Sequence, residues 1–257
     1  MRCTGQEFVV SQKLSAALSA AEKIRAQFFR DASTFMLAGS VVRGDATAYS
    51  DLDLVVVFER VDSAKRQSFV FEGWPVEAFI HDPQTLEYFF REVDRPSGVP
   101  SLPNMVSEGI ELSCETKFGS RMKDLASRVL AEGPIIWGQK ERENSRYAIS
   151  DMVEDIREPR NRAELRIVVS NLYSAIADHF LRSQSQWSAK GKSIPRRLMS
   201  VDPEFHNRFA QAFETAFTSD DAAAVIRLCE DVLEPDGGFL FDGYIRDAPK
   251  EWRIPNA

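Results

Sequence analysis

One stretch, Leu37 to Phe58, constrains the fold of this chain more than any other. It reads LAGSVVRGDATAYSDLDLVVVF and ends in an apolar run typical of a buried strand. Because side chains alternate across a strand, Asp51 and Asp53 should share one face, while Leu52 and Leu54 anchor the other face in a core. Two carboxylates this close repel each other unless a cation intervenes. Mg²⁺ is the usual cation for an all-oxygen site that handles phosphates.

A Gly-Ser pair lies ten residues before these aspartates. Phe35 to Leu37 is expected to be a short strand, after which Gly39 allows a tight turn and a close approach of the backbone to a ligand. Ser40 supplies a hydroxyl at the start of a short helix, where free backbone N–H groups favour phosphate. Arg43, one turn later, either reaches the same phosphate or pairs with Asp45. A phosphate cradle beside a metal-binding pair is typical of phosphoryl or nucleotidyl transfer.

The pattern G-S-x10-D-x-D resembles the signature of the polymerase-beta-like nucleotidyltransferase superfamily. The wording GSVVRGDATAYSDLDLVVV is most similar to that of its aminoglycoside nucleotidyltransferases, and FEGWPVEAFIHDPQTLEYF resembles the matching hairpin of the kanamycin enzymes. The resemblance covers roughly the first third of the chain. It implies an α+β protein, with a mixed sheet flanked by helices in residues 1–133 and a helical bundle in residues 134–257.

The resemblance also implies roles for further acidic residues. Glu77 occupies the position of the family's third carboxylate, and would complete a shell for a pair of Mg²⁺ ions with the two aspartates. Its alternative is an exposed charge on a strand. In the kanamycin enzymes a helix carboxylate of the second domain is the general base, a part that Asp151, Glu154 or Asp155 could take here. A solvated acidic helix face is the alternative for these three residues.

The composition and the net charge limit the kinds of binding partner that we expect. Of 257 residues, 44% are apolar and 28% charged, as in ordinary globular proteins. We expect a cytoplasmic protein, because no apolar run is long enough to span a bilayer and no signal peptide is evident. Cys3, Cys114 and Cys229 suggest neither a disulfide framework nor a zinc site. A net charge of −7 disfavours a long nucleic-acid footprint and favours a cationic small molecule.

Periodicity and turn signals divide the chain into expected elements. Helices are expected at 7–30, 41–43, 83–93, 118–131, 146–156, 162–183, 203–218 and 220–233, and strands at 35–37, 51–58, 67–71 and 75–80. The Pro-rich segment Arg95–Pro103 is expected to be a loop. The tail from Pro235 is expected to pack back on the bundle, and the domain boundary to lie near Gly133.

Two further patterns look chemical at first sight. Gly191-Lys192-Ser193 is similar to the end of a P-loop, but Gln186 stands where the earlier glycine is required. The basic residues around it are expected to be solvated, or else to close on a triphosphate: Lys190, Lys192, Arg196 and Arg197. The histidines, His81, His179 and His206, lack zinc-ligand spacing.

These features together predict a metal-dependent nucleotidyltransferase. A nucleoside triphosphate, with ATP expected, would bind at Gly39, Ser40 and Arg43, and Asp51, Asp53 and Glu77 would hold Mg²⁺. The acceptor would be a hydroxyl of a small, aminoglycoside-like molecule. The alternatives are transfer to a protein or RNA, or a catalytically silent nucleotide-binding module. The sequence leaves a homodimer open.

Overall fold

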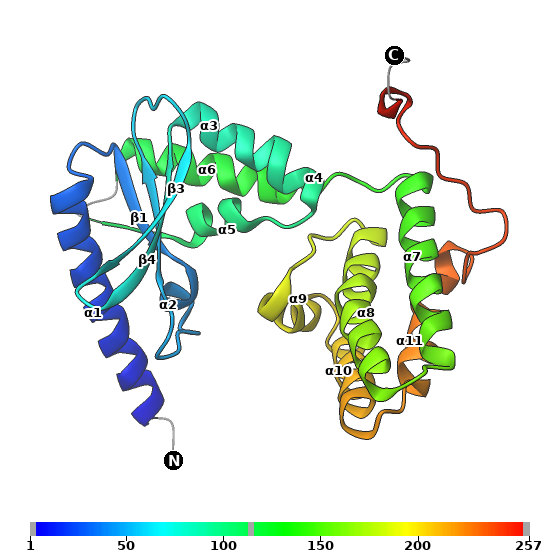
Figure 1. The fold of residues 1–257 in the computed structure, drawn as a ribbon. Coiled ribbons are helices and arrows are strands. Elements are labelled where there is room, and N and C mark those ends of the chain that lie inside the picture. The colour runs from blue at the N-terminus through cyan, green and yellow to red at the C-terminus, as the bar shows by residue number, and fades with distance from the viewer. Residues whose placement is uncertain (1–3, 113–115, 254–257) are drawn as a thin grey trace. The chain divides into compact units, whose positions relative to one another are not determined.

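The computed structural model describes residues 4–112 and 116–253 (Figure 1). The chain forms two compact units, Met1–Pro134 and Ile135–Ala257. The first unit contains a sheet with helices and the second is helical, which confirms the predicted α+β class. Among the described residues, no helix is long and apolar enough to cross a membrane.

The first unit is built on a five-stranded mixed sheet in the order β3-β4-β2-β1-β5. Its strands are β1 (Thr34–Ala38), β2 (Leu52–Val57), β3 (Lys65–Phe71), β4 (Trp74–His81) and β5 (Ile110–Glu111). β2 and β4 run parallel, and the other neighbours are antiparallel. The expected strands and the hairpin are confirmed, whereas β5 was not predicted because two residues carry no periodic signal.

The hairpin between β3 and β4 turns at Glu72 and Gly73, both of which have positive φ. Two left-handed residues in a row make a turn whose twist matches that of the flanking strands, so the turn fixes the register. Ser68 of β3 then lies opposite Glu77 of β4, and Arg66 lies opposite Phe79.

Each face of the sheet carries its own core. On one face, α1 (Thr4–Phe28) packs through small residues and Ile24 against alternate strand residues such as Leu54 and Ala78. On the other face, Met36, Val55 and Val57 of the sheet pack against helical residues. The elements on this second face are α3 (Pro83–Tyr88), the π-helix η1 (Phe89–Asp94), α5 (Ser101–Glu108) and α6 (Lys117–Glu132), and α4 (Arg95–Ser97) follows η1 directly. A short helix, α2 (Gly39–Arg43), connects β1 toward β2 and ends at the left-handed Gly44, as predicted.

The prediction of a loop at Arg95–Pro103 was wrong. This segment contains α4, which continues η1 without a break, then residues 98–100 outside any helix, and then the start of α5, where Pro103 lies in the first helical turn. Proline is tolerated there, because the first N–H groups of a helix have no partner within the helix. The side chain of Asp94 further supports the start of α5, since it accepts a hydrogen bond from the N–H of Leu102 at 2.9 Å.

The second unit is a bundle around one continuous apolar core, contributed by every long helix of the unit. Its helices are α7 (Gln139–Arg157), α8 (Arg162–Ser183), α9 (Ile194–Val201), α10 (Pro203–Ser219) and α11 (Ala223–Leu233), with short 3-10 turns at Gly191–Ser193, Glu234–Asp236 and Lys250–Trp252. The predicted helices are confirmed. α9 was not predicted, because the basic residues in it suggested a loop.

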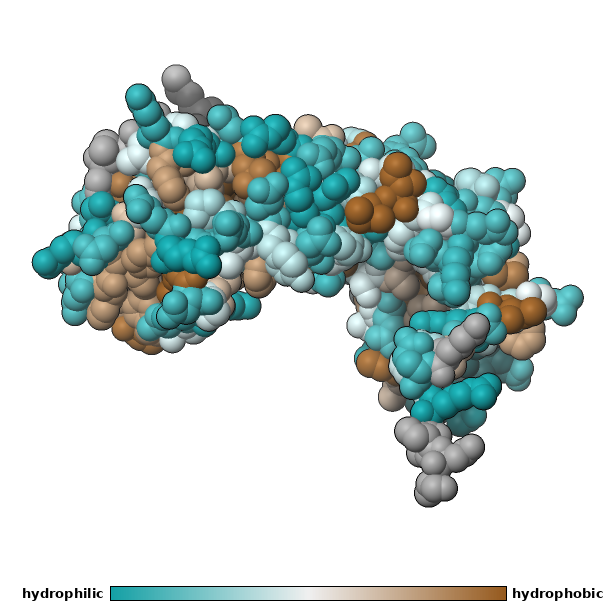
Figure 2. All heavy atoms as spheres, turned by 90° about the horizontal axis from the view of Figure 1, so that it is seen from above, coloured by the Kyte–Doolittle hydropathy of each residue, from teal (hydrophilic) through white to brown (hydrophobic). Residues whose placement is uncertain are grey.

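The tail after Pro235 packs back on α7, as predicted. Arg146 donates hydrogen bonds to the carbonyls of Gly237 and Gly238 at 2.9 Å. The ring of Tyr147 stacks on that of Tyr244 with centroids 4.0 Å apart. Figure 2 shows a mostly hydrophilic surface on which hydrophobic residues form separate patches.

Candidate functional site

Two aspartates stand where β2 begins. Asp51 directly precedes the strand and Asp53 is its second residue, while Leu52 and Leu54 are fully buried in the core beneath α1. The alternation of β2 therefore directs both carboxylates to the opposite face, as the sequence predicted. The buried leucines hold the strand in place, and the backbone of the strand in turn fixes the positions of both carboxylates.

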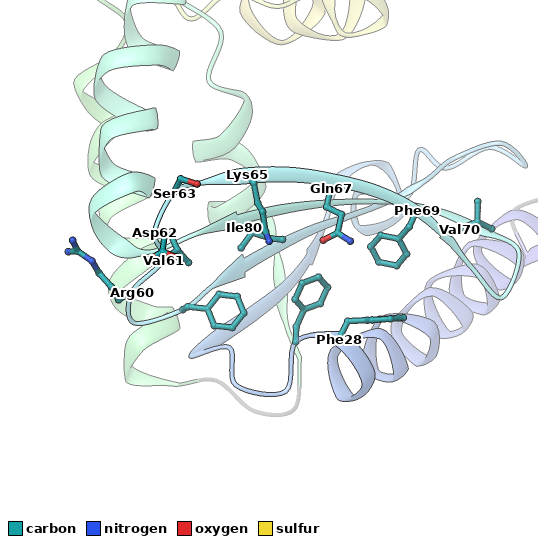
Figure 3. Close-up of a pocket in the computed structure, with 12 residues that line it drawn as sticks. Phe28, Arg60, Val61, Asp62, Ser63, Lys65, Gln67, Phe69, Val70 and Ile80 are labelled. Atoms are coloured by element: carbon teal, nitrogen blue, oxygen red, sulfur yellow. The ribbon is translucent and has the colours of Figure 1, made fainter.

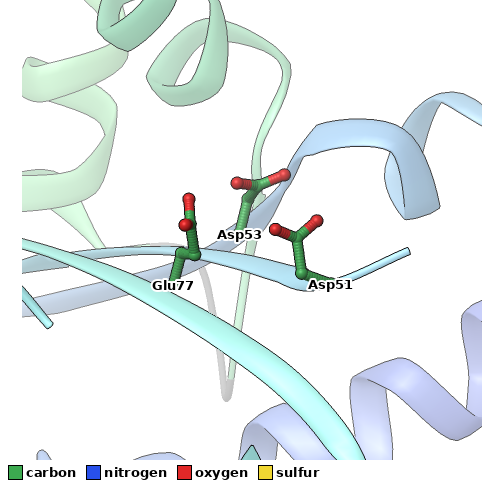
Figure 4. Close-up of side chains that lie close together, drawn as sticks. All are labelled: Asp51, Asp53 and Glu77. Atoms are coloured by element: carbon green, nitrogen blue, oxygen red, sulfur yellow. The ribbon is translucent and has the colours of Figure 1, made fainter. Parts of the chain in front are cut away.

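Glu77 is brought to the same place by the parallel pairing of β4 with β2. Asp53 and Glu77 are direct register partners, and partners on neighbouring strands lie only about 5 Å apart. Asp51, Asp53 and Glu77 each offer a carboxylate oxygen within 4.8 Å of the others. Figure 4 shows the three side chains projecting to the same side of the sheet.

The Gly-Ser turn lies against these carboxylates. Gly39 has a φ of +76°, and a Cβ at this position would lie 2.7 Å from Cγ of Asp53. Only glycine leaves room for Asp53 here, because any other side chain would collide with it. Ser40 follows in the first turn of α2 and is 9% exposed. The sequence thus predicted correctly that the turn and the aspartates lie together.

A cation already contacts this cluster. The guanidinium of Arg66 donates to the carboxylate of Glu77 from the neighbouring strand β3. Its hydrogen bond with Glu77 raises the pKa of Arg66, and the negative charges of Asp53 and Asp51 act in the same direction. Sequence reasoning missed Arg66. The signal was available, because a tight turn at Glu72-Gly73 places Arg66 diagonally across from Glu77.

Arg43 is held by other acids. Its guanidinium forms ion pairs with Asp45, at 3.5 Å, and with Glu108 of α5. The structure thus shows the second of the two arrangements that the sequence allowed for Arg43. A contact between Arg43 and a phosphate stays a prediction.

The remaining predicted residues lie elsewhere. Asp151, Glu154 and Asp155 are exposed on α7 in the second unit, and Glu154 pairs with Arg157 at 3.0 Å. That one of the three acts as a base stays a prediction. Of the basic residues near Gly191, Arg197 donates to the carbonyl of Trp187 at 2.7 Å, and burial lowers its pKa.

The histidines and cysteines show no catalytic arrangement in the parts of the chain that are described. His179 is fully buried between Ser145, 2.9 Å from Nδ1, and Asp236, 3.1 Å from Nε2, and burial lowers its pKa. His179, which lies in α8, thereby connects α7 with the 3-10 turn Glu234–Asp236. Burial raises the pKa of the Cys229 thiol to about 12. Cys3 and Cys114 lie outside the described residues.

An open hollow of about 820 Å³ lies on the α1 face of the sheet, opposite to the carboxylates. Lys65, Gln67 and Phe69 point into it from β3, and Phe28 from the end of α1 (Figure 3). These residues alternate with Arg66 and Ser68 along β3, so the hollow and the carboxylate cluster are on different faces. The hollow is not part of the candidate site.

The carboxylate cluster has the properties of a metal site. Its donors are all oxygen atoms, which suit hard cations such as Mg²⁺. Carboxylates at this spacing repel one another when charged, and a nearby cation relieves that repulsion. Asp51, Asp53 and Glu77 would hold the metal.

Comparison with known proteins gives a family for the segment that carries this cluster. Residues 18–93 match the nucleotidyltransferase domain family, and this segment includes the Gly-Ser turn and all three carboxylates. Among solved structures, a nucleotidyltransferase-like protein from Exiguobacterium sibiricum 255-15 is 14% identical, with a TM-score of 0.41, over 85% of this chain and 73% of that chain. No curated protein matches the chain. The family match supports a nucleotidyltransferase domain in the segment 18–93, and nucleotidyl transfer is the general chemistry of that family.

Proposed function

We propose that this protein transfers a nucleoside monophosphate from a nucleoside triphosphate, with ATP as the expected donor, to a hydroxyl of a small acceptor. In this reaction the acceptor oxygen forms a bond to the α-phosphorus, and the bond from that phosphorus to its bridging oxygen breaks. Pyrophosphate leaves, and the hydroxyl proton passes to a base or to water. The observation that supports this function best is the convergence of Asp51, Asp53 and Glu77 beside the Gly-Ser turn.

The residues of the Gly-Ser turn and those of the carboxylate cluster would have different roles in this reaction. The N–H groups and hydroxyl at Gly39 and Ser40 would bind the triphosphate, since unpaired N–H groups at a helix start favour anions. Asp51, Asp53 and Glu77 would hold a pair of Mg²⁺ ions. Such ions supply, when bound, a lower pKa for the acceptor hydroxyl and positive charge near the leaving pyrophosphate. The rigid strands β2 and β4 keep the carboxylates in place, which lowers the cost of reorganisation during the reaction.

The acceptor that we propose is a cationic amino sugar of the aminoglycoside kind. Its support is the resemblance of the motif and the net charge of −7. A negative protein attracts a polycation and repels a nucleic-acid backbone. Binding of such an acceptor should therefore weaken as salt screens the field.

The test is transfer of label from α-³²P-labelled ATP, with Mg²⁺, to panels of aminoglycosides, RNAs and proteins at two salt concentrations. Asp51→Asn and Asp53→Asn should each reduce transfer and pyrophosphate release to background without unfolding the sheet. Asp62→Asn is the matched control, because Asp62 lines the hollow on the other face. Full turnover by either cluster variant would overturn the assignment of the carboxylates.

The choice of acceptor has its own outcomes. Labelling of an RNA or a protein alone would replace the amino-sugar acceptor and keep the chemistry. Tight ATP binding with no labelled acceptor in any panel would favour a nucleotide-binding module without catalysis.

A further inference from the structure

Arg66 contacts one of the proposed metal ligands directly. Its Nη2 donates to Oε1 of Glu77, and the two side chains differ in exposure, at 59% for Arg66 and 25% for Glu77. The arginine is thus the more exposed partner of the pair, and the glutamate is the more buried one.

The geometry of the hairpin explains why Arg66 lies there. Ser68 is directly opposite Glu77, and Arg66 is opposite Phe79, so Arg66 is the diagonal neighbour of Glu77 on the same face. The guanidinium also lies 5.2 Å from the centroid of the Phe79 ring. A cation over an aromatic face is attracted to it, and the ring therefore holds the guanidinium beside the cluster.

The charges of the site make this contact competitive with metal binding. A carboxylate oxygen that accepts a hydrogen bond from a guanidinium offers less electron density to a second cation, and two cations on one small carboxylate repel each other. We propose that Arg66 competes with a divalent cation for Glu77, because the guanidinium hydrogen-bonds Oε1 and must release this oxygen before a cation can bind there. This inference rests on the proposed function, because it takes Glu77 to be a metal ligand.

The test measures binding of Mn²⁺ alone to the full-length protein, by isothermal titration calorimetry or by the electron paramagnetic resonance signal of free Mn²⁺. Arg66→Gln should tighten Mn²⁺ binding by about threefold to fivefold, the upper range for a half-exposed ion pair. Lys65→Gln is a closely matched control, since it removes the same charge from the adjacent residue, which faces the hollow on the other side of the sheet. Loss of one positive charge acts at long range in both variants. A larger gain in Mn²⁺ affinity in Arg66→Gln than in Lys65→Gln therefore measures the direct contact of Arg66 with Glu77.

A second pair of variants tests whether the effect passes through Glu77. In the Glu77→Gln background, Arg66→Gln should change Mn²⁺ affinity no more than Lys65→Gln does. If the native protein binds Mn²⁺ and Arg66→Gln equals Lys65→Gln, the competition is refuted while the metal site stands. If neither the native protein nor Arg66→Gln binds Mn²⁺ at millimolar concentration, the metal site of the proposed function fails, and the competition with it.

Discussion

Replacing Gly39 by alanine should disable the carboxylate cluster although all three acidic residues are kept. Gly39 has a φ of +76°, and the new methyl group would lie 2.7 Å from Cγ of Asp53, where ordinary contacts begin near 3.4 Å. Oδ2 of Asp53 would lie closer still than Cγ, so the Asp53 side chain must retreat by more than about 0.7 Å. A displacement of this size can lower the rate of the reaction by as much as about a hundredfold in a preorganised site. Left-handed backbone strain adds about 1–2 kcal/mol to the cost in stability.

Gly73→Ala separates the collision from the strain. Gly73 has a φ of +84°, but a Cβ there has no atom within 4 Å. Both variants should lose about 1–2 kcal/mol of stability in the sheet, because each forces alanine into the left-handed region. Hydrogen exchange of peptides from β2 and β4 would measure this loss, and calorimetry would measure Mn²⁺ affinity. Equal Mn²⁺ affinities of the two variants would refute the reasoning, since only Gly39 lies against Asp53.

Three further predictions concern single side chains. Ser40→Ala should weaken binding of a non-hydrolysable ATP analogue by about 1 to 2 kcal/mol in calorimetry, the usual worth of a hydrogen bond to a charged group, and unchanged affinity would mean that the phosphates lie elsewhere. Burial lowers the pKa of His81 from 6.5 to about 4. The unfolded chain thus binds this proton more readily, and the free energy of unfolding should fall by up to about 3 kcal/mol between pH 6.5 and pH 4. Urea titrations read by protection of β4 peptides would show this slope, and a slope that persists in His81→Leu would assign it to other groups. Asp82→Ala should lower the free energy of unfolding by about 1–2 kcal/mol in the same assay. The Asp82 carboxylate accepts hydrogen bonds from the N–H groups of Thr85, at 2.8 Å, and Val61, at 3.1 Å. A loss below about 0.5 kcal/mol, the lower limit for an N-cap, would contradict that role.

Much of the fold follows from local signals in the chain. The apolar run after Asp51 predicts β2, and the two-residue turn at Glu72-Gly73 predicts the hairpin, because period-2 alternation and turn chemistry act over a few residues. The segment Arg95–Pro103 could not be predicted in this way. Its prolines suggest a loop, whereas Pro103 lies in the first turn of α5, the start of which is supported by the hydrogen bond from the N–H of Leu102 to Asp94.

The candidate site was predictable to the extent that it depends on one strand. Asp51 and Asp53 follow from alternation alone, whereas the position of Glu77 required the family resemblance, because parallel pairing between distant strands leaves no local signature. Arg66 was missed for a different reason, because the strand was expected to begin at Gln67, whereas β3 begins at Lys65. Its pairing depends on the register of β3 against β4, and an exposed arginine on an edge strand is most often a solvated charge.

The parallel pairing of β2 with β4 has a consequence for folding kinetics. The β3–β4 hairpin closes locally, whereas Asp53 meets Glu77 only when the whole hairpin docks on β2. Since the entropy of loop closure must be paid before non-local contacts form, we expect this docking to be among the last steps for the first unit. A ligand that needs both residues then stabilises the native state but not the transition state. Mn²⁺ should therefore slow unfolding of the first unit and leave its refolding rate unchanged, and faster refolding with Mn²⁺ would show that the carboxylates assemble early.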